Sequence, residues 1–205
     1  MSKIQVDTID TRSGTSTMQI GSTNTSTITL GVSGDTINVP SGVTIANAGT
    51  ATGFGESNTP SFRARLSGDQ SVANQTTTKL SLATEDWDTD SAWNTSNYNF
   101  TIPSGQAGKY FFNGHVRILS IAGHDTTNYF SQVYIRKNTS DIAGHRVMDY
   151  SATSKDLDLQ ISTVVDLSVS DVIDFTVYHN GSGQTTQNIS SSTASTWFTG
   201  FKITT

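Results

Sequence analysis

The sequence predicts an all-β chain, in which an extended fibrous segment precedes a sandwich or jelly roll of short strands. Aromatic residues divide the chain, because Phe54 is the only one of 18 that lies in residues 1–60. After residue 61, apolar and polar side chains alternate along many short segments, which is typical of strands with one buried face. No 11-residue window has the apolar spacing of a helix. Together these observations predict strands throughout the second part.

Composition excludes several classes of function. The 205 residues are 34% hydrophobic and 14% charged, with a net charge of −5, so no basic field exists to hold nucleic acid. The chain has no cysteine and therefore no disulfide, thiolate zinc site or cysteine nucleophile. No run approaches the roughly 20 apolar residues of a membrane helix, and Met1–Gln5 lacks the apolar core of a secretion signal. We expect no nucleic-acid partner and no membrane insertion.

Residues 1–50 contain a degenerate repeat instead of the large apolar side chains of a core. Each copy is an alternating pair, and the pairs are Met18/Ile20, Ile28/Leu30, Ile37/Val39 and Val43/Ile45. One such strand buries almost nothing, whereas three chains wound together bury a narrow axial core. We interpret 1–50 as an attachment and intertwined stalk segment; a flexible Ser/Thr/Gly linker is the alternative. Residues 51–60 have the Gly and Pro content of a hinge.

Residues 61–205 are predicted to form one head domain of alternating strands. The clearest case is 157–167, where Leu, Ile and Val alternate with Asp, Gln and Ser. Turn residues such as Pro103-Ser104-Gly105 and Asn180-Gly181 separate the predicted strands. The predicted strands are 62–66, 98–102, 109–121, 129–137, 142–149, 157–167, 172–179 and 196–203. Many short strands in about 145 residues indicate a sandwich or jelly roll.

Four motifs occur in one order along this head. They are Phe100-Thr101-Ile102-Pro103 with Gly108-Lys109-Tyr110-Phe111-Phe112, then Val133-Tyr134-Ile135-Arg136-Lys137-Asn138, then Val164-Val165-Asp166-Leu167 with Asp171-Val172-Ile173, and finally Phe198-Thr199-Gly200-Phe201. The ordered set resembles the complement globular-head and tumour necrosis factor-like jelly rolls. Thr139 and Ser170 stand where that family has Gly, so these two turns depart from the pattern. The resemblance implies a TNF-like jelly roll that forms homotrimers, often at the tip of a trimeric stalk.

The N-terminal part carries a second resemblance. The sequence MSKIQVDTIDTRSG, followed by MQIG and ITLG, is similar to the beginnings of structural proteins of marine tailed phages, especially cyanophage fibre-like proteins. This similarity implies a bacteriophage virion protein, made in the host cytoplasm and attached to other virion proteins through residues 1–50. Its jelly-roll head is then expected to bind a glycan or protein on the host surface.

Two groups of large, mostly aromatic residues are candidate binding residues. Trp87, Trp93 and Tyr98 gather around one predicted loop, where they stack on the apolar faces of a receptor's sugars or, alternatively, cap the open end of the sandwich. Trp197, Phe201 and Ile203 alternate with Phe198 and Gly200 on the last strand. In the resembled family that strand lies near the three-fold axis, which implies that Trp197, Phe201 and Ile203 belong to a trimer interface.

The acidic run 85–90 is the best metal candidate, since Asp86, Asp88 and Asp90 at alternate positions offer oxygen ligands to Ca²⁺. The run lacks the turn glycine and the bidentate Glu of an EF-hand, so a solvated loop is the favoured interpretation and no cofactor is expected. His115, His124, His145 and His179 have no nucleophile elbow near them. His115 is expected on the strand face opposite Tyr110 and Phe112, as a structural or interface histidine.

These observations favour a non-enzymatic virion protein, a short trimeric tail fibre or spike whose head binds a host receptor. A head decoration or tail-adaptor protein that binds other virion proteins is the first alternative. A polysaccharide-degrading enzyme is the second, although 60 residues of stalk are too short for the β-helix that such enzymes use. A secreted cytokine-like ligand fits the fold resemblance but has no secretion signal to support it.

Overall fold

The computed structural model describes Ile20, residues 23–24, 26–46, 58–121, 129–148, 155–181 and 185–203. Two compact units are present, Met1–Thr52 and Gly53–Thr205. Each unit is described by itself. No helix occurs in the described ranges, and none there is therefore long and apolar enough to cross a membrane.

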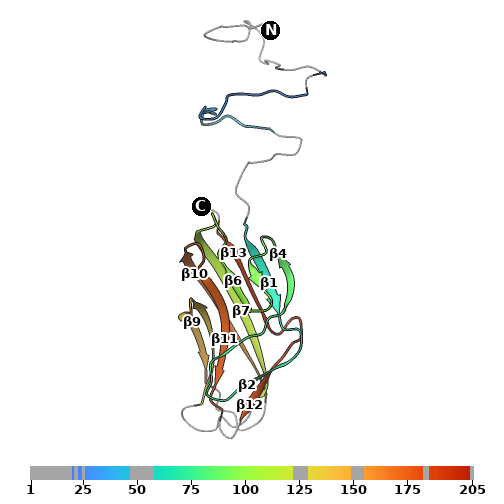
Figure 1. The fold of residues 1–205 in the computed structure, drawn as a ribbon, viewed down its shortest axis with the longest axis vertical. Helices are drawn as coiled ribbons and strands as arrows, with labels where there is room; N and C mark the ends of the chain where they lie inside the picture. Colours follow the sequence, from blue (N-terminus) through green and yellow to red (C-terminus); the bar gives the residue numbers. More distant parts are fainter. Residues whose placement is uncertain are drawn as a thin grey trace. The chain divides into compact units, whose positions relative to one another are not determined.

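The head consists of thirteen strands in the described residues (Figure 1). They are β1 Ser61–Arg65, β2 Gln70–Ala73, β3 Thr78–Lys79, β4 Thr84–Asp88, β5 Trp93–Asn94, β6 Asn99–Thr101, β7 Gly108–Ile121, β8 Ser131–Lys137, β9 Ser140–Val147, β10 Lys155–Leu167, β11 Val172–His179, β12 Thr186–Ile189 and β13 Trp197–Lys202. All eight strands predicted from alternation are present within a few residues of their predicted bounds, while β2, β3, β4, β5 and β12 are short strands that alternation did not predict.

These strands form two antiparallel sheets. The first has the order β2-β12-β7-β13-β1-β4, with β10 on the other edge of β7, and the second has the order β5-β6-β11-β8-β9, with β3 against β11. Eight strands make the framework, as β1-β13-β7-β10 and β6-β11-β8-β9. Counted along the chain, these orders are 1-8-3-6 and 2-7-4-5, which is the arrangement of a jelly roll. The predicted all-β jelly-roll fold is confirmed; the intertwining of residues 1–50 stays a prediction.

A layer of stacked aromatic rings fills the space between the sheets. Phe62 lies 4.8 Å from Trp93 and 4.7 Å from Phe100, ring centre to ring centre. Phe198 stacks on Phe112 at 5.7 Å, and all of these side chains are buried. Gly200 makes this packing possible, because a Cβ there would lie 2.4 Å from the Phe112 ring. Burying such rings removes large apolar areas from water and stabilises the head.

The two turns that lack the family's glycine keep a left-handed backbone. Thr139 has φ +73° and Ser170 has φ +70°, in a region that glycine enters at no steric cost. Polar contacts hold both turns. Asn138 donates from Nδ2 to Asp171 Oδ1 at 2.7 Å and accepts from Val172 N at 2.9 Å. The side chain of Asn138 thus joins the β8–β9 turn to the β10–β11 turn.

In the N-terminal unit, residues 26–46 are extended arms separated by two turns. Asp35 N donates to Val32 O at 3.0 Å, and Val43 N donates to Pro40 O at 3.2 Å. Gly34 and Gly42 take φ +96° and +86° in these turns. No strand occurs within 26–46, so the arms have no sheet partner, and Gly31 takes φ +82° between Leu30 and Val32.

Candidate self-association face and surface sites

The outer face of the sheet β4-β1-β13-β7-β10 carries half-exposed aromatic side chains at its centre. β7 alternates strictly, with Tyr110 and Phe112 inside and Phe111 outside. Phe111 pairs with Phe201 of β13 and with Val164 of β10 on its other side. The Phe111 and Phe201 rings lie 5.4 Å apart, and Val164 is 55% exposed. An apolar cluster of this kind on an outer sheet face is typical of a surface that another molecule covers.

Trp197 extends this face to the beginning of β13. Its ring stacks on His115 of β7, with 6.1 Å between ring centres. The Arg63 guanidinium lies 5.1 Å from the Trp197 ring on the side of β1, a cation–π contact. Trp87 of β4 pairs with Arg63 in register and is 46% exposed. The aromatic surface therefore runs across β4, β1, β13 and β7.

Charges on the same face neutralise one another. Arg117 donates from Nε to Asp158 Oδ1 and from a terminal nitrogen to Asp158 Oδ2, both at 2.9 Å. This paired hydrogen bond holds the pKa of Asp158 below its usual value, although burial opposes it. His115 Nδ1 donates to Ser195 O at 2.6 Å, and its Nε2 lies 3.5 Å from Asp158 Oδ1. A face whose charges are already paired costs less to desolvate.

The residues predicted for a trimer interface lie on or beside this face. Trp197 and Phe201 are half-buried and point outward from β13, and Ile203 follows the strand and donates from its backbone N to Lys109 O at 2.8 Å. Sequence reasoning missed Phe111 and Val164. The sequence contained the necessary information, because both are apolar residues at outward-facing positions of the alternating segments 109–121 and 157–167.

The three aromatic residues predicted to bind a receptor do not form one surface. Trp93 is 5% exposed, stacks on Phe62, and donates from Nε1 to Leu82 O at 3.1 Å. The assignment of Trp93 as a receptor-binding residue is therefore wrong, and its burial follows the alternative of a residue that closes the core. Tyr98 packs against that core at a hairpin position with φ +53°. Trp87 remains exposed, on the other sheet.

The acidic run does not converge on a metal site. Asp86 pairs with Arg65 at 2.8 Å and with Arg63 at 3.3 Å. Asp88 accepts from Trp93 N at 2.8 Å, and Asp90 accepts from Thr89 Oγ1 at 2.8 Å. Within the described part of the chain, no group of three acidic or histidine side chains is placed to hold a metal. The calcium alternative is corrected: these carboxylates form ion pairs and stabilise a turn.

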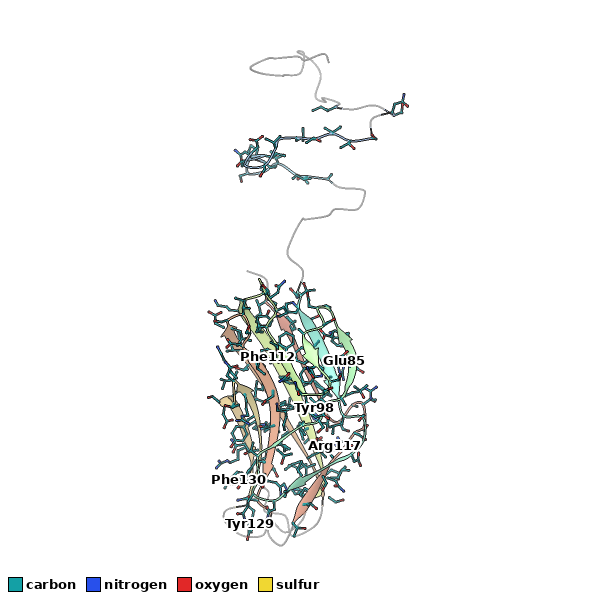
Figure 2. The ribbon with its side chains drawn as sticks, viewed as in Figure 1. Glu85, Tyr98, Phe112, Arg117, Tyr129 and Phe130 are labelled. Atoms are coloured by element: carbon teal, nitrogen blue, oxygen red, sulfur yellow. The ribbon has the colours of Figure 1, made fainter. Side chains whose placement is uncertain are left out.

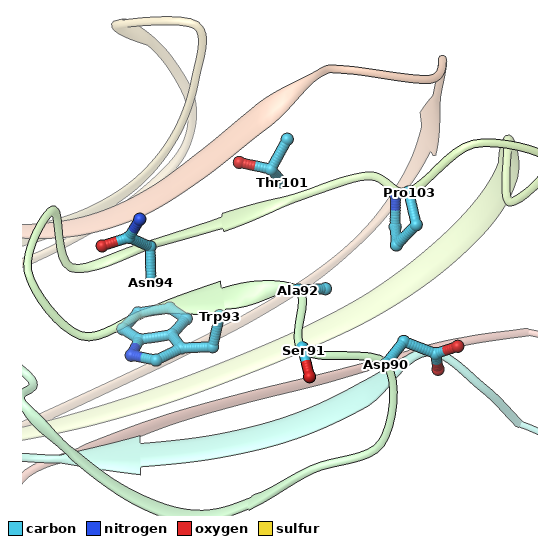
Figure 3. Close-up of a pocket in the computed structure, with 7 residues that line it drawn as sticks. All are labelled: Asp90, Ser91, Ala92, Trp93, Asn94, Thr101 and Pro103. Atoms are coloured by element: carbon cyan, nitrogen blue, oxygen red, sulfur yellow. The ribbon is translucent and has the colours of Figure 1, made fainter.

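An open cleft of about 340 Å³ lies along β5, at an edge of the second sheet (Figure 3). Asp90, Ser91, Asn94, Thr101 and Pro103 line it. The lining has one carboxylate, which already accepts the Thr89 hydroxyl, and no histidine. This set of groups offers hydrogen bonds but no acid–base pair for catalysis.

The remaining histidines are placed separately from one another. His179 is fully buried, and its Nε2 donates to Val72 O at 3.1 Å. Burial lowers the pKa of His179, and the hydrogen bond to Val72 opposes this only partly. His145 lies on β9 with a buried Nδ1 that has no partner. His124 lies outside the described residues.

A second aromatic group lies at the end of the head opposite its C-terminus (Figure 2). Phe130 is layered between the Arg146 guanidinium, 3.9 Å from its ring, and Tyr178, whose ring centre is 5.3 Å away. Arg146 Nε donates to Gln132 Oε1 at 3.0 Å. We call Phe130, Gln132, Arg146 and Tyr178 the distal cluster. Sequence reasoning missed it, because only the pairing of β8 with β9 and with β11 brings its members together.

Comparisons with known proteins show similarity of fold. No protein-family model matches the chain, and no curated protein sequence matches it. Among solved structures, the globular domain of zebrafish complement 1qA protein is similar, with 15% identity, 70% of this chain and 97% of that chain covered, and a TM-score of 0.49. The Eiger TNF structure from S. frugiperda is 11% identical over 70% of this chain and 90% of that chain, also with a TM-score of 0.49. The jelly roll itself is established by the strand order of this chain.

Proposed function

We propose that this chain is a homotrimeric structural protein whose head associates through the outer face of β4-β1-β13-β7-β10. One observation carries the proposal: Phe111, Phe201 and Val164 form an apolar cluster on a face where Arg117 and Asp158 pair with each other. A monomer gains nothing from exposing this cluster, whereas a second copy that covers it removes apolar area from water.

We further propose that the trimer is a short fibre of a phage virion that attaches to a host surface. The support is the similarity of residues 1–50 to phage fibre-like proteins. Three copies of one weak site on a rigid head raise the effective concentration of the second and third contacts. The activity proposed is therefore multivalent attachment, without catalysis.

The distal cluster is the surface that we propose for the receptor, in place of Trp87, Trp93 and Tyr98. Aromatic rings beside a guanidinium and an amide offer stacking and directed hydrogen bonds, the combination that binds acidic sugars. Arg146→Gln is expected to weaken binding of the full chain to host cells or to an acidic glycan at least tenfold. Arg136→Gln, on the neighbouring strand, is the matched control, and equal binding by both variants would contradict this placement.

Two exposed valines test the self-association face directly. Val164 lies on the face beside Phe111, and Val169 lies in the β10–β11 turn with 44% exposure. Since neither side chain is buried in one head, Val164→Asp and Val169→Asp leave the fold of a single head intact. Light scattering should give monomers for Val164→Asp and trimers for Val169→Asp. Trimers from Val164→Asp would contradict the proposal, because they would show that this face is not covered in the trimer.

A further inference from the structure

The N-terminal unit exposes an unusual amount of apolar surface for its length. Seven large apolar side chains in residues 26–46 are between 40% and 76% exposed; they are Ile28, Leu30, Val32, Ile37, Val39, Val43 and Ile45. In the head, the comparable side chains of the core are at most 8% exposed. Scattered exposed valines are ordinary, but a continuous row within 18 residues marks a surface that is covered by a partner.

The backbone of the same segment is also without a sheet partner. Within residues 26–46 the turns are closed by Asp35 N to Val32 O and Val43 N to Pro40 O. Between the turns the backbone is extended and forms no strand. Extended arms carry rows of N–H and C=O groups that pair readily with another extended chain. The segment thus presents both apolar side chains and backbone hydrogen-bonding groups.

The chemistry of this surface defines its partner. Asp35 is the one charged residue in the sequence from 26 to 46, and its Oδ2 already accepts from Val32 N at 2.9 Å inside a turn. The segment has no basic side chain with which to bind a nucleic acid or an acidic glycan. The complementary partner is a neutral, extended, apolar chain, which is what a second copy of the segment provides.

The proposed head trimer places such copies within reach. Residues 47–57 separate the segment from the head, and eleven residues span at most about 40 Å. Three segments tethered this closely meet at an effective concentration of about a millimolar or more. This step rests on the proposed function, because it requires three heads in one particle.

We propose that Ser26–Ala46 is an interchain zipper in which each arm packs against the same arm of the other two copies. Because residues i and i+2 of an extended arm share a side, the rows 28/30, 37/39 and 43/45 face inward as three layers. The turns at Gly34 and Gly42 lie between the layers. Equal tether lengths favour equal register, so Ile37 meets Ile37 of a partner copy.

The absence of native cysteine makes this register measurable in the full chain. Ile37→Cys is expected to form disulfide-linked dimers on mild oxidation, since two of the three thiols in a layer join and one remains. Thr36→Cys, on the opposite side of the same arm, is the matched control and should cross-link at least tenfold less. Equal cross-linking by the two variants, or none by Ile37→Cys in a trimer, would overturn the zipper.

A second measurement avoids the cysteine substitution, because Ile37→Cys itself removes apolar packing from the proposed zipper. Thermolysin cleaves before bulky apolar residues, so it should cut 26–46 slowly in the wild-type trimer and at least tenfold faster in Ile28→Asp/Ile37→Asp. Light scattering on the same samples separates the two proposals. A trimer with rapid wild-type cleavage removes the zipper and leaves the head trimer, whereas a monomer removes both.

Discussion

The N-terminal segment and the head differ in how their alternating apolar side chains are covered. Both are rich in Ser and Thr, and both place apolar side chains at alternate positions. In the head, the alternating side chains of two sheets face one another, and residues such as Phe62 and Phe198 are completely buried. In the segment, the same alternation leaves Ile37 63% exposed. Alternation alone therefore defines a strand face, and a core requires a second face opposite it.

The two regions also differ in the size of their apolar side chains. The head core contains stacked rings whose individual burial stabilises the fold by about 1.5–3 kcal/mol relative to exposure. The segment has only aliphatic side chains on single arms, which is enough for a narrow core shared among chains and too little for one chain alone. The aromatic core therefore stabilises each head, and the apolar surfaces that one copy leaves uncovered drive assembly.

The largest expected effect is a loss of stability of the head from a substitution that leaves the N-terminal segment unchanged. Phe62→Ala removes a ring that contacts Trp93, Phe100 and Phe198, and it should lower the free energy of unfolding of the head by about 3–5 kcal/mol. Ile37→Ala should change the value for the head by less than about 0.5 kcal/mol, because Ile37 lies in the N-terminal unit and not in the head core. Denaturant titration of the full chain measures both values, and similar losses would contradict the contrast.

A smaller effect is expected from acid, through His179. Burial lowers its pKa in the folded head, so unfolding releases a histidine that binds a proton more readily, near pH 6.5. Stability from the neutral imidazole is complete above pH 6.5 and falls as the pH drops below it, by at most about 1.4 kcal/mol per pH unit.

The control for this prediction is a side chain that does not titrate between pH 5 and 7.5. His179→Gln should have a lower urea midpoint at pH 7.5 than wild type, yet a flatter decline between pH 7 and 5. A decline as steep as that of wild type would assign the acid sensitivity to other groups. Asp158 acts with the same sign in a different range, since its lowered pKa contributes stability that is lost only at more acidic pH.

The smallest effect is a gain in stability at the two left-handed turns. Thr139→Gly and Ser170→Gly should each stabilise the head by about 0.5–1 kcal/mol, because φ near +70° strains a residue that has a Cβ. Ser140→Gly, one residue further along in an extended strand, is the control and should destabilise. Thermal melts distinguish these variants; a loss of stability in both turn variants would show that their side chains hold the turns.

Much of the fold could be predicted from the sequence, because strict alternation marks the longest strands. For β10, the residues from 157 to 167 specify both the strand and its buried face. The short strands β2, β4 and β12 could not be predicted in this way. Gln70–Ala73 and Thr186–Ile189 are too short and polar to show a period, and they become strands because they pair with each other and because β12 pairs with β7.

The candidate sites were less accessible to sequence reasoning than the fold. Trp93 lies beside acidic and polar residues in the sequence, and only its long-range stacking on Phe62 shows that it belongs to the core. The outward row of β13 could be predicted, because Trp197 and Phe201 alternate with the buried Phe198. Phe111 and Val164 join that row only through strand pairing across the sheet.

The central claim is that uncovered apolar surfaces of this chain are covered by further copies of itself. The most direct test is the solution mass of the full chain, measured by light scattering over a dilution series. The account predicts a constant mass of three times 21.9 kDa. A mass of 21.9 kDa throughout the series would contradict it, and the aromatic face of the head would then belong to a different partner.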